Sequence, residues 1–372
     1  MRGPIVITGG GTGGHIFPMQ AIAEQLEQRG VASTKLHFVG SRRGQEETLL
    51  GALAIDLTLL PGRGIRRSFA PKALLDNFGA IAGLVGAAAV AFVKVGRWRP
   101  SVAVSVGGYA SFAVALAAVL WRRPLVLVEL DATPGAAHRL LGRFASVRCT
   151  SFPSNEARTV FTGAPLRDAV VAVDRSPSSR ERARAACTPP IEPGRQVVVV
   201  MTGSLGAKSV NRAVSDLARL WASRSDRTLI HVTGRRDFDE ITNDAPELSG
   251  LDYRVVAFGD MIELWSVCDA AVCRAGATTV AELTALGICS VLVPLPGAPG
   301  DHQTKNARVV ADAGGARLVP DGQCDAATLA RILDDVMEPD TLASMSEAAR
   351  SLGHRDASSE IARVVCEVGG WS

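Results

Sequence analysis

The chain has 372 residues, of which 47% are hydrophobic and 21% charged, and its formal net charge is +3. This length fits two domains of ordinary size, and the composition is too apolar for a disordered chain. The net charge is far below that of a dedicated nucleic-acid-binding protein, so we expect no nucleic acid partner.

The sequence predicts no membrane span, secretory signal or disulfide framework. The apolar stretch 78–93 is shorter than the roughly 20 residues that cross a bilayer, and Gly107 and Gly108 interrupt the stretch 101–120. The first residues lead directly into a predicted strand, without the apolar stretch of a signal peptide. The seven cysteines are odd in number and scattered, which is typical of free thiols in a reducing compartment.

Short apolar runs alternate with helical patterns along the first part of the chain. Such alternation is typical of a parallel sheet covered by helices on both faces. The predicted strands are 5–8, 36–39, 57–60, 102–106 and 125–129, and the predicted helices are 15–28, 72–95, 111–121 and 135–144.

A polar stretch follows residues 162–167, and the alternation then restarts. We therefore predict an α/β protein with two Rossmann-like, doubly wound parallel-sheet domains, 1–164 and 165–350, and a C-terminal helix within 351–372 that packs back on the first domain. The predicted strands of the second domain are 197–201, 229–233, 254–257, 270–273, 290–293 and 316–319; its predicted helices are 208–222, 278–286 and 303–313, and a helical tail runs from 325 to about 367.

A glycine-rich turn joins the first predicted strand to the first helix. Its sequence, TGGGTGGH at 8–15, lets backbone amides approach a ligand at a helix N-terminus, which favours an anionic group. The same glycines satisfy GxGxxG, which is typical of dinucleotide binding. The second predicted strand, however, ends in Gly40-Ser41-Arg42-Arg43 and not in the acid that would hold a ribose, although the arginines could hold an NADP phosphate.

Two further turns repeat the strand–glycine–helix pattern, VGGYAS at 106–111 and MTGSLGA at 201–207. A dehydrogenase needs one such turn, whereas an enzyme that joins two phosphorylated molecules has use for several. The segment RAGATTVAE at 274–282 then follows a buried strand and begins a helix. Its amides and threonine hydroxyls predict a phosphate site, and Glu282 lies one turn on, where it can accept from both hydroxyls of a ribose. The pattern also fits a capping box.

Five motifs in this order resemble the MurG-type glycosyltransferases of family 28: GGGTGGHIFP at 9–18, GGY at 107–109, TGAPLR at 162–167, GSLGA at 203–207 and CRAGATTVAE at 273–282. The resemblance covers nearly the whole chain and implies a GT-B fold, in which two Rossmann-like domains face a cleft. It also implies inverting transfer of N-acetylglucosamine from UDP-N-acetylglucosamine to the C4 hydroxyl of undecaprenyl-linked N-acetylmuramoyl pentapeptide, which converts lipid I to lipid II in peptidoglycan synthesis.

Residue roles follow from motif position in this resemblance. His15 is the candidate general base, because a hydroxyl nucleophile needs a proton acceptor near neutral pH; alternatively it holds the loop. Glu129 would orient the acceptor or share the base role. The acceptor would contact Thr12, Gly13, Gly14, Gly107, Gly108 and Tyr109, and the UDP-sugar would contact Arg167, Ser204, Gly206, Phe258, Met261, Arg274, Ala277, Thr278, Thr279, Glu282 and Gln303.

The resemblance implies no cofactor and no metal, since the helix start and an arginine would stabilise the charge on the departing UDP. Asp237-Phe238-Asp239 spells DxD, but it lies in a polar stretch between elements, and we assign no metal site to it.

The chain departs from the family pattern near the expected ligands. Residues 128–131 are VELD where the family commonly has HEQN, Leu205 replaces a glutamine, and Phe112-Ala113 replaces Gly-Pro. Each lost hydrogen-bonding partner usually costs about 1–3 kcal/mol. The sequence therefore leaves open a divergent acceptor, a weaker enzyme or compensating changes. It also leaves open a nucleotide-sugar epimerase of the same architecture, a paralogue that only binds UDP-sugar or lipid, and a Rossmann oxidoreductase.

Basic and apolar residues interleave in segments 64–69 and 72–78 and at Trp121-Arg122-Arg123. This pattern suits attachment to an anionic membrane surface, and it also fits an ordinary amphipathic helix with solvated arginines. The lipid-linked acceptor implied by the resemblance favours a peripheral protein on the cytoplasmic face of the cell membrane.

Overall fold

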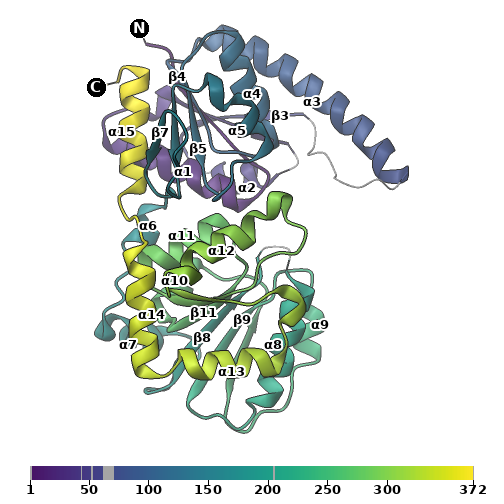
Figure 1. Cartoon of the computed structure of the whole chain (residues 1–372), viewed down its shortest axis with the longest axis vertical. Helices are drawn as coiled ribbons and strands as arrows, with labels where there is room; N and C mark the ends of the chain where they lie inside the picture. Colours follow the sequence, from purple (N-terminus) through teal and green to yellow (C-terminus); the bar gives the residue numbers. More distant parts are fainter. Residues whose placement is uncertain (1, 43, 52, 62–70, 204–205, 372) are drawn as a thin grey trace. The chain divides into compact units, whose positions relative to one another are not determined.

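The computed structural model describes residues 2–42, 44–51, 53–61, 71–203 and 206–371, and for 71–82 it describes the helix without its side chains. The chain divides into two compact units. The first comprises residues 1–168 and 355–372, and the second comprises 169–354. Each unit contains one parallel sheet with helices packed on it (Figure 1).

Within the described residues, seven parallel strands form the sheet of the first unit in the order β3-β2-β1-β4-β5-β6-β7. The chain winds from β1 through β2 to β3 on one side and then crosses to β4 on the other side of β1, so the switch point lies between β1 and β4. The strands are β1 (Ile5–Thr8), β2 (Leu36–Ser41), β3 (Asp56–Leu60), β4 (Val102–Ser105), β5 (Leu125–Glu129), β6 (Val147–Thr150) and β7 (Thr159–Phe161).

The helices of the first unit bury both faces of this sheet. Helices α3 and α4 cover one face, where Ala91 and Val114 pack with Val6 of β1. Side chains alternate along a strand, so Ile5 and Ile7 point to the opposite face. The helices are α1 (Gly13–Gln28), α2 (Glu46–Leu50), α3 (Pro71–Trp98), α4 (Tyr109–Leu120), α5 (Ala136–Leu141) and α15 (Ala357–Gly369), with short 3-10 turns at Ser33–Lys35 and Gly142–Phe144. The short helix α6 (Asp168–Val171) spans the boundary with the second unit.

Helix α15 brings the last part of the chain back to the first unit, where it packs on α1, β4 and β6 (Figure 1). The Ser358 hydroxyl accepts a hydrogen bond from the Leu166 amide at 2.8 Å and donates one to the Leu166 carbonyl at 2.7 Å. Ile361 and Val365 supply a fully buried apolar side. The first unit is therefore built from two distant parts of the sequence.

Within the described residues of the second unit, six parallel strands follow the order β10-β9-β8-β11-β12-β13, with the switch point between β8 and β11. The strands are β8 (Gln196–Met201), β9 (Arg227–Val232), β10 (Asp252–Val256), β11 (Ala270–Cys273), β12 (Cys289–Leu292) and β13 (Ala316–Leu318). The helices are α7 (Pro177–Ala186), α8 (Lys208–Leu220), α9 (Phe238–Asn243), α10 (Met261–Val267), α11 (Ala277–Leu286), α12 (His302–Asp312), α13 (Ala326–Val336) and α14 (Pro339–Ser351), with 3-10 turns at Pro299–Asp301 and Asp321–Gln323.

The predicted α/β class with two doubly wound parallel sheets is confirmed. The predicted helical tail from 325 to about 367 consists of three helices, α13, α14 and α15. Pro339 starts a new helix, and Gly353 packs so closely on the Thr284 carbonyl that an added Cβ would lie 2.5 Å from its oxygen. No helix in the described part of the chain combines the length and hydropathy needed to cross a bilayer.

Candidate active site

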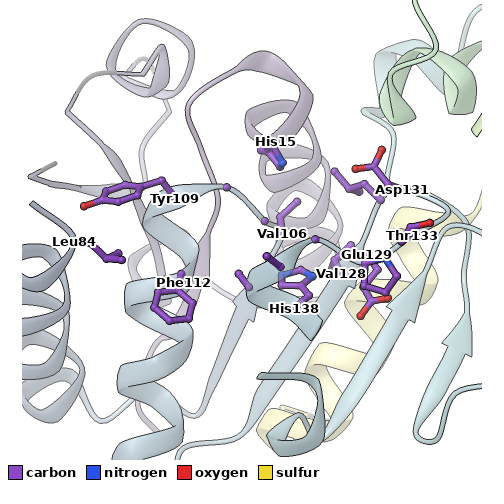
Figure 2. Close-up of a pocket in the computed structure, with 17 residues that line it drawn as sticks. His15, Leu84, Val106, Tyr109, Phe112, Val128, Glu129, Asp131, Thr133 and His138 are labelled. Atoms are coloured by element: carbon purple, nitrogen blue, oxygen red, sulfur yellow. The ribbon is translucent and has the colours of Figure 1, made fainter. Parts of the chain in front are cut away.

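A pocket of about 440 Å³ opens in the first unit where β1, β4 and β5 end (Figure 2). This is the switch point of the sheet, where open α/β sheets bind their ligands. Five of the predicted acceptor-side and catalytic residues line it together: His15, Gly107, Gly108, Tyr109 and Glu129. Thr12, Gly13 and Gly14 immediately precede His15 at the N-terminus of α1 and are not part of the described pocket wall.

The two glycine turns of the first unit pack against each other, backbone on backbone. Gly107 and Gly108 have φ values of +107° and +89°, which glycine adopts without strain. A Cβ on Gly108 would lie 2.5 Å from the Gly10 carbonyl oxygen, and one on Gly107 would lie 3.2 Å from Nε2 of His15. These contacts require glycine at both positions and place the His15 ring directly over the second turn.

Glu46 supports the first glycine turn from inside the protein. Its carboxylate is fully buried and accepts hydrogen bonds from the Gly11 amide at 3.0 Å and the Ser41 amide at 2.7 Å. The sequence analysis did not identify this residue. The sequence does contain an indication of this role, because Glu46 closely follows a strand that ends near a glycine, and an acidic side chain in that place can accept hydrogen bonds from loop amides.

Glu129 is part of a buried ion-pair group. Its Oε1 accepts from Nε and Nη2 of Arg148, both at 2.7 Å, and Arg148 also pairs with Glu156. Burial raises the pKa of Glu129, and the neighbouring guanidinium opposes that rise. Arg148 was missed, although an arginine in an apolar strand indicates a buried acidic partner.

His138 lines the same pocket and was also missed by the sequence analysis (Figure 2). Its Nε2 lies 2.9 Å from the Ser105 hydroxyl at the end of β4. Burial, together with the smaller effects of the nearby His15 and Arg148, lowers the pKa of His138 to about 4. The imidazole is therefore neutral at physiological pH. Its sequence signal was weak, because a lone histidine within a predicted helix is usually not functional.

The departures from the family pattern lie in this pocket. Val128 and Leu130 form part of its aliphatic wall and are both buried. Figure 2 shows the polar side chains of Asp131, Thr133 and His138 around the same hollow. The pocket thus keeps polar groups at two positions of the family pattern, Glu129 and Asp131, and at Thr133 and His138 outside it.

The glycine turn of the second unit follows β8. Gly206 has a φ of +74°, and an added Cβ would lie 2.5 Å from the Thr233 carbonyl and 2.9 Å from Oδ2 of Asp237. Asn211 donates to both of these oxygens, at 2.9 and 2.8 Å, and its own oxygen lies 3.0 Å from Nε2 of the buried His231. A buried polar network therefore supports this turn. Ser204 and Leu205 lie outside the described residues.

The start of α11 lies directly after β11, on the other side of the switch point. Ala277, Thr278 and Thr279 form its first turn, with Gly276 as N-cap. Glu282 lies one turn further and is only 5% exposed, and its Oε2 accepts from Nε1 of the fully buried Trp265 at 2.9 Å. The structure thus brings together a helix N-terminus, which suits a phosphate, and a carboxylate held in place, which suits the two hydroxyls of a diol.

The remaining predicted donor-side residues have local partners or stand at the surface. Arg274 donates to Asp321 at 2.5 Å and to two carbonyls after β12, and Gln303 accepts from the Leu295 amide at 2.9 Å. Phe258 is 64% exposed, three residues before Met261 begins α10. Arg167 belongs to the first unit, where its guanidinium stacks on Phe17 at 4.3 Å.

In the described residues, no group of three or more His, Cys, Asp or Glu side chains is arranged to hold a metal ion. Asp237 of the DxD sequence instead accepts from Asn211 and pairs with Arg236.

Comparisons with known proteins identify the relatives of this chain. Residues 5–148 match the glycosyltransferase family 28 N-terminal domain and residues 197–361 the corresponding C-terminal domain. A protein of Alkalilimnicola ehrlichii named UDP-N-acetylglucosamine–N-acetylmuramyl-(pentapeptide) pyrophosphoryl-undecaprenol N-acetylglucosamine transferase is 38% identical, over 99% of each chain.

Solved structures agree with this assignment. MurG of Acinetobacter baumannii superposes with a TM-score of 0.72 at 26% identity, over 98% of this chain and 99% of that one, and the predicted GT-B fold is confirmed. UDP-GlcNAc 2-epimerase of Neisseria meningitidis has a TM-score of 0.64 over 99% of this chain and 100% of that one, but its identity is 14%, so the likeness concerns the fold alone. The chain belongs to glycosyltransferase family 28, among the transferases of N-acetylglucosamine to lipid-linked N-acetylmuramyl pentapeptide.

Proposed function

We propose that this protein transfers N-acetylglucosamine from UDP-N-acetylglucosamine to the C4 hydroxyl of undecaprenyl-pyrophosphoryl N-acetylmuramoyl pentapeptide, with inversion at the anomeric carbon. The observation that carries the proposal is the full-length relationship to a transferase with this name. The glycine turns and the buried polar groups at both switch points supply the chemistry that the reaction needs.

The first unit would bind the acceptor and activate its hydroxyl. His15 is the proposed base, since its ring lies over Gly107 in the pocket and an imidazole accepts protons near neutral pH. It becomes cationic when it takes the proton. The low pKa of His138 keeps that neighbour neutral, and Glu129 and Glu156 offset the charge of Arg148, so little like-charge repulsion opposes this step.

The second unit would bind UDP-N-acetylglucosamine. The backbone around Gly206 and the start of α11 suit the diphosphate, and Glu282 suits the ribose hydroxyls. Negative charge that develops on the departing UDP is favoured at a helix N-terminus, and the proposal uses no cofactor or metal.

A labelled-donor assay tests the proposal. The protein is incubated with radiolabelled UDP-N-acetylglucosamine, with and without the lipid-linked muramoyl pentapeptide. Label that moves to lipid only in the presence of acceptor supports transfer. Formation of epimerised UDP-sugar without acceptor would show that the protein is an epimerase and not a transferase. UDP binding without any turnover would show that the chain binds the nucleotide but has no catalytic activity.

We further propose that the first unit attaches peripherally to anionic lipid at the cytoplasmic face of the membrane. Phe92 and Val93 of α3 are 41% and 67% exposed, and Trp121, which stacks on Phe92 at 5.0 Å, is 44% exposed. Lys94 and Arg122 flank them in sequence, and apolar side chains beside cations suit a lipid surface. Of the predicted contacts, Ile65 lies outside the described residues, as do the side chains of Leu75 and Phe78.

Co-sedimentation with vesicles containing anionic lipid tests this attachment. We expect the double variant Phe92→Ser/Trp121→Ser to bind vesicles several-fold more weakly than the unmodified protein. The matched control is Leu220→Ser, which changes a side chain 58% exposed in the second unit and leaves vesicle binding unchanged. Unchanged binding of the double variant would contradict attachment through this surface.

A further inference from the structure

The indole of Trp265 holds the carboxylate of Glu282 inside the second unit. Trp265 is fully buried in α10 and Glu282 is 5% exposed in α11, and the Nε1–Oε2 distance is 2.9 Å. An indole has a single donor, so its direction is fixed once the ring is packed. A hydrogen bond to a charged acceptor in a poorly hydrated site is among the stronger ones in proteins.

Helix α10 is itself held firmly. The Asp260 side chain caps it by accepting from the Ile262 amide at 2.8 Å, and Arg175 donates to the Trp265 carbonyl at 2.5 Å. The ring of Trp265 therefore cannot easily follow a movement of Glu282. Met261, a predicted uracil contact, lies four residues before Trp265 and so on the same side of the helix.

We propose that Trp265 is a positioning residue for ribose recognition: its indole N–H fixes the Glu282 carboxylate in the orientation that accepts the hydroxyls of the donor's ribose. The inference rests on the proposed function, in which Glu282 contacts the ribose. It adds a residue that no sequence motif of the chain contains, since Trp265 lies outside all five motifs.

The experiment compares UDP with 2′-deoxy-UDP, which lacks one of the hydroxyls that Glu282 would accept. Dissociation constants are measured by titration calorimetry for the unmodified chain and for Trp265→Phe, which removes the N–H and keeps an aromatic ring. We expect the variant to bind UDP about tenfold more weakly, the effect of one charge-assisted hydrogen bond. Binding of 2′-deoxy-UDP, which keeps one of these hydroxyls, should weaken by a smaller factor, so the preference for the ribose form falls.

The matched control is Trp221→Phe, the same change at another buried tryptophan of the second unit, 3% exposed and packed in its core. It should leave the preference for UDP over 2′-deoxy-UDP as it is in the unmodified chain. Trp265→His, which restores a ring N–H, should recover part of the preference. Trp265→Met, which also lacks a ring N–H, replaces Trp265→Phe if thermal unfolding shows that the latter does not fold. In the transferase assay, Trp265→Phe should raise KM for the donor and leave kcat nearly unchanged.

Two outcomes would overturn the inference and are distinct from failure of the proposed function. An equal loss of affinity for both nucleotides would mean that Trp265 only supports the fold, and unchanged affinities for both would mean that it does not orient Glu282. If the unmodified chain bound neither nucleotide, the proposed function itself would fail.

Discussion

The two units share one architecture, and their candidate sites offer different chemical groups. Each has its candidate site at the switch point of a parallel sheet, beside a glycine turn. In the first unit, ionisable side chains such as His15 and Glu129 line the pocket itself. In the second, the candidate site consists of a helix start and the turn at Gly206, and polar side chains such as Asn211 and His231 support that turn from inside the protein. Proton transfer needs titratable side chains, whereas phosphate binding can be done by backbone amides.

The largest effects are expected from two variants that test whether the first unit carries out turnover and the second unit binds the donor. His15→Ala should lower kcat by about 10²–10⁴-fold, the usual contribution of a general base, and leave the affinity for UDP nearly unchanged. Glu282→Ala should mainly weaken UDP binding. Steady-state kinetics and UDP titration of both variants check this, and an equal loss of UDP affinity in the two would remove the distinction between the units.

Removal of the buried cation in the first unit should destabilise that unit. Arg148→Met leaves Glu129 buried without its guanidinium partner, which typically costs about 3–5 kcal/mol. Urea unfolding of the full chain measures the change. Arg363→Met is the control, since Arg363 is a half-exposed member of surface ion pairs on α15 and its loss should destabilise the protein much less. If the free energy of unfolding fell by similar amounts in the two variants, the buried ion pair would contribute no more to stability than the surface pairs.

One substitution in each glycine turn sharpens the comparison. Gly108→Ala and Gly206→Ala both place a Cβ at 2.5 Å from a carbonyl oxygen in the left-handed region, and we expect each to cost about 2–4 kcal/mol. Only the second should also weaken UDP binding. Gly86→Ala in α3, where a Cβ meets open space, should not destabilise the protein. Loss of UDP affinity in Gly108→Ala would argue against the assignment of the donor to the second unit.

The second unit should lose stability in mild acid because of His231. Burial lowers the pKa of His231 to about 3, whereas the unfolded chain titrates near the ordinary value of 6.5. Between these pH values the unfolded state binds more protons than the folded state. The contribution of neutral His231 to the free energy of unfolding is therefore complete above pH 6.5 and is lost as the pH falls. Between pH 7 and pH 5 the loss should be about 2 kcal/mol. Unfolding of His231→Gln at the two pH values should show a smaller difference than the unmodified chain.

The sequence predicts the glycine turns and all the described strands except β6 and β7, because apolar runs and Gly pairs are local signals. It does not predict α7, whose polar residues resemble a linker although Ser176 caps a regular helix at 177–186. It also misses Arg148, Glu46 and Trp265. Each of these acts through a partner on another element, and single-sequence patterns do not show which elements meet.

The acceptor-side assignments show the same limit. His15 follows from its place at a helix start, but His138 enters the pocket only because α5 packs against the end of β4. Val128 and Leu130 looked like the loss of polar partners at a site. The structure shows that polar groups at other positions, Asp131 and His138, line the same hollow.

The return of α15 to the first unit has a consequence for synthesis on the ribosome. Domains generally fold in the order in which their residues emerge, but the first unit stays incomplete until residues beyond 354 have been made. The second unit is continuous in sequence and begins later, yet all of its residues emerge before the first unit can close. The surface on which α15 packs, which includes Val102 beside Gly369, would then be an exposed apolar surface in the nascent chain to which a chaperone could bind.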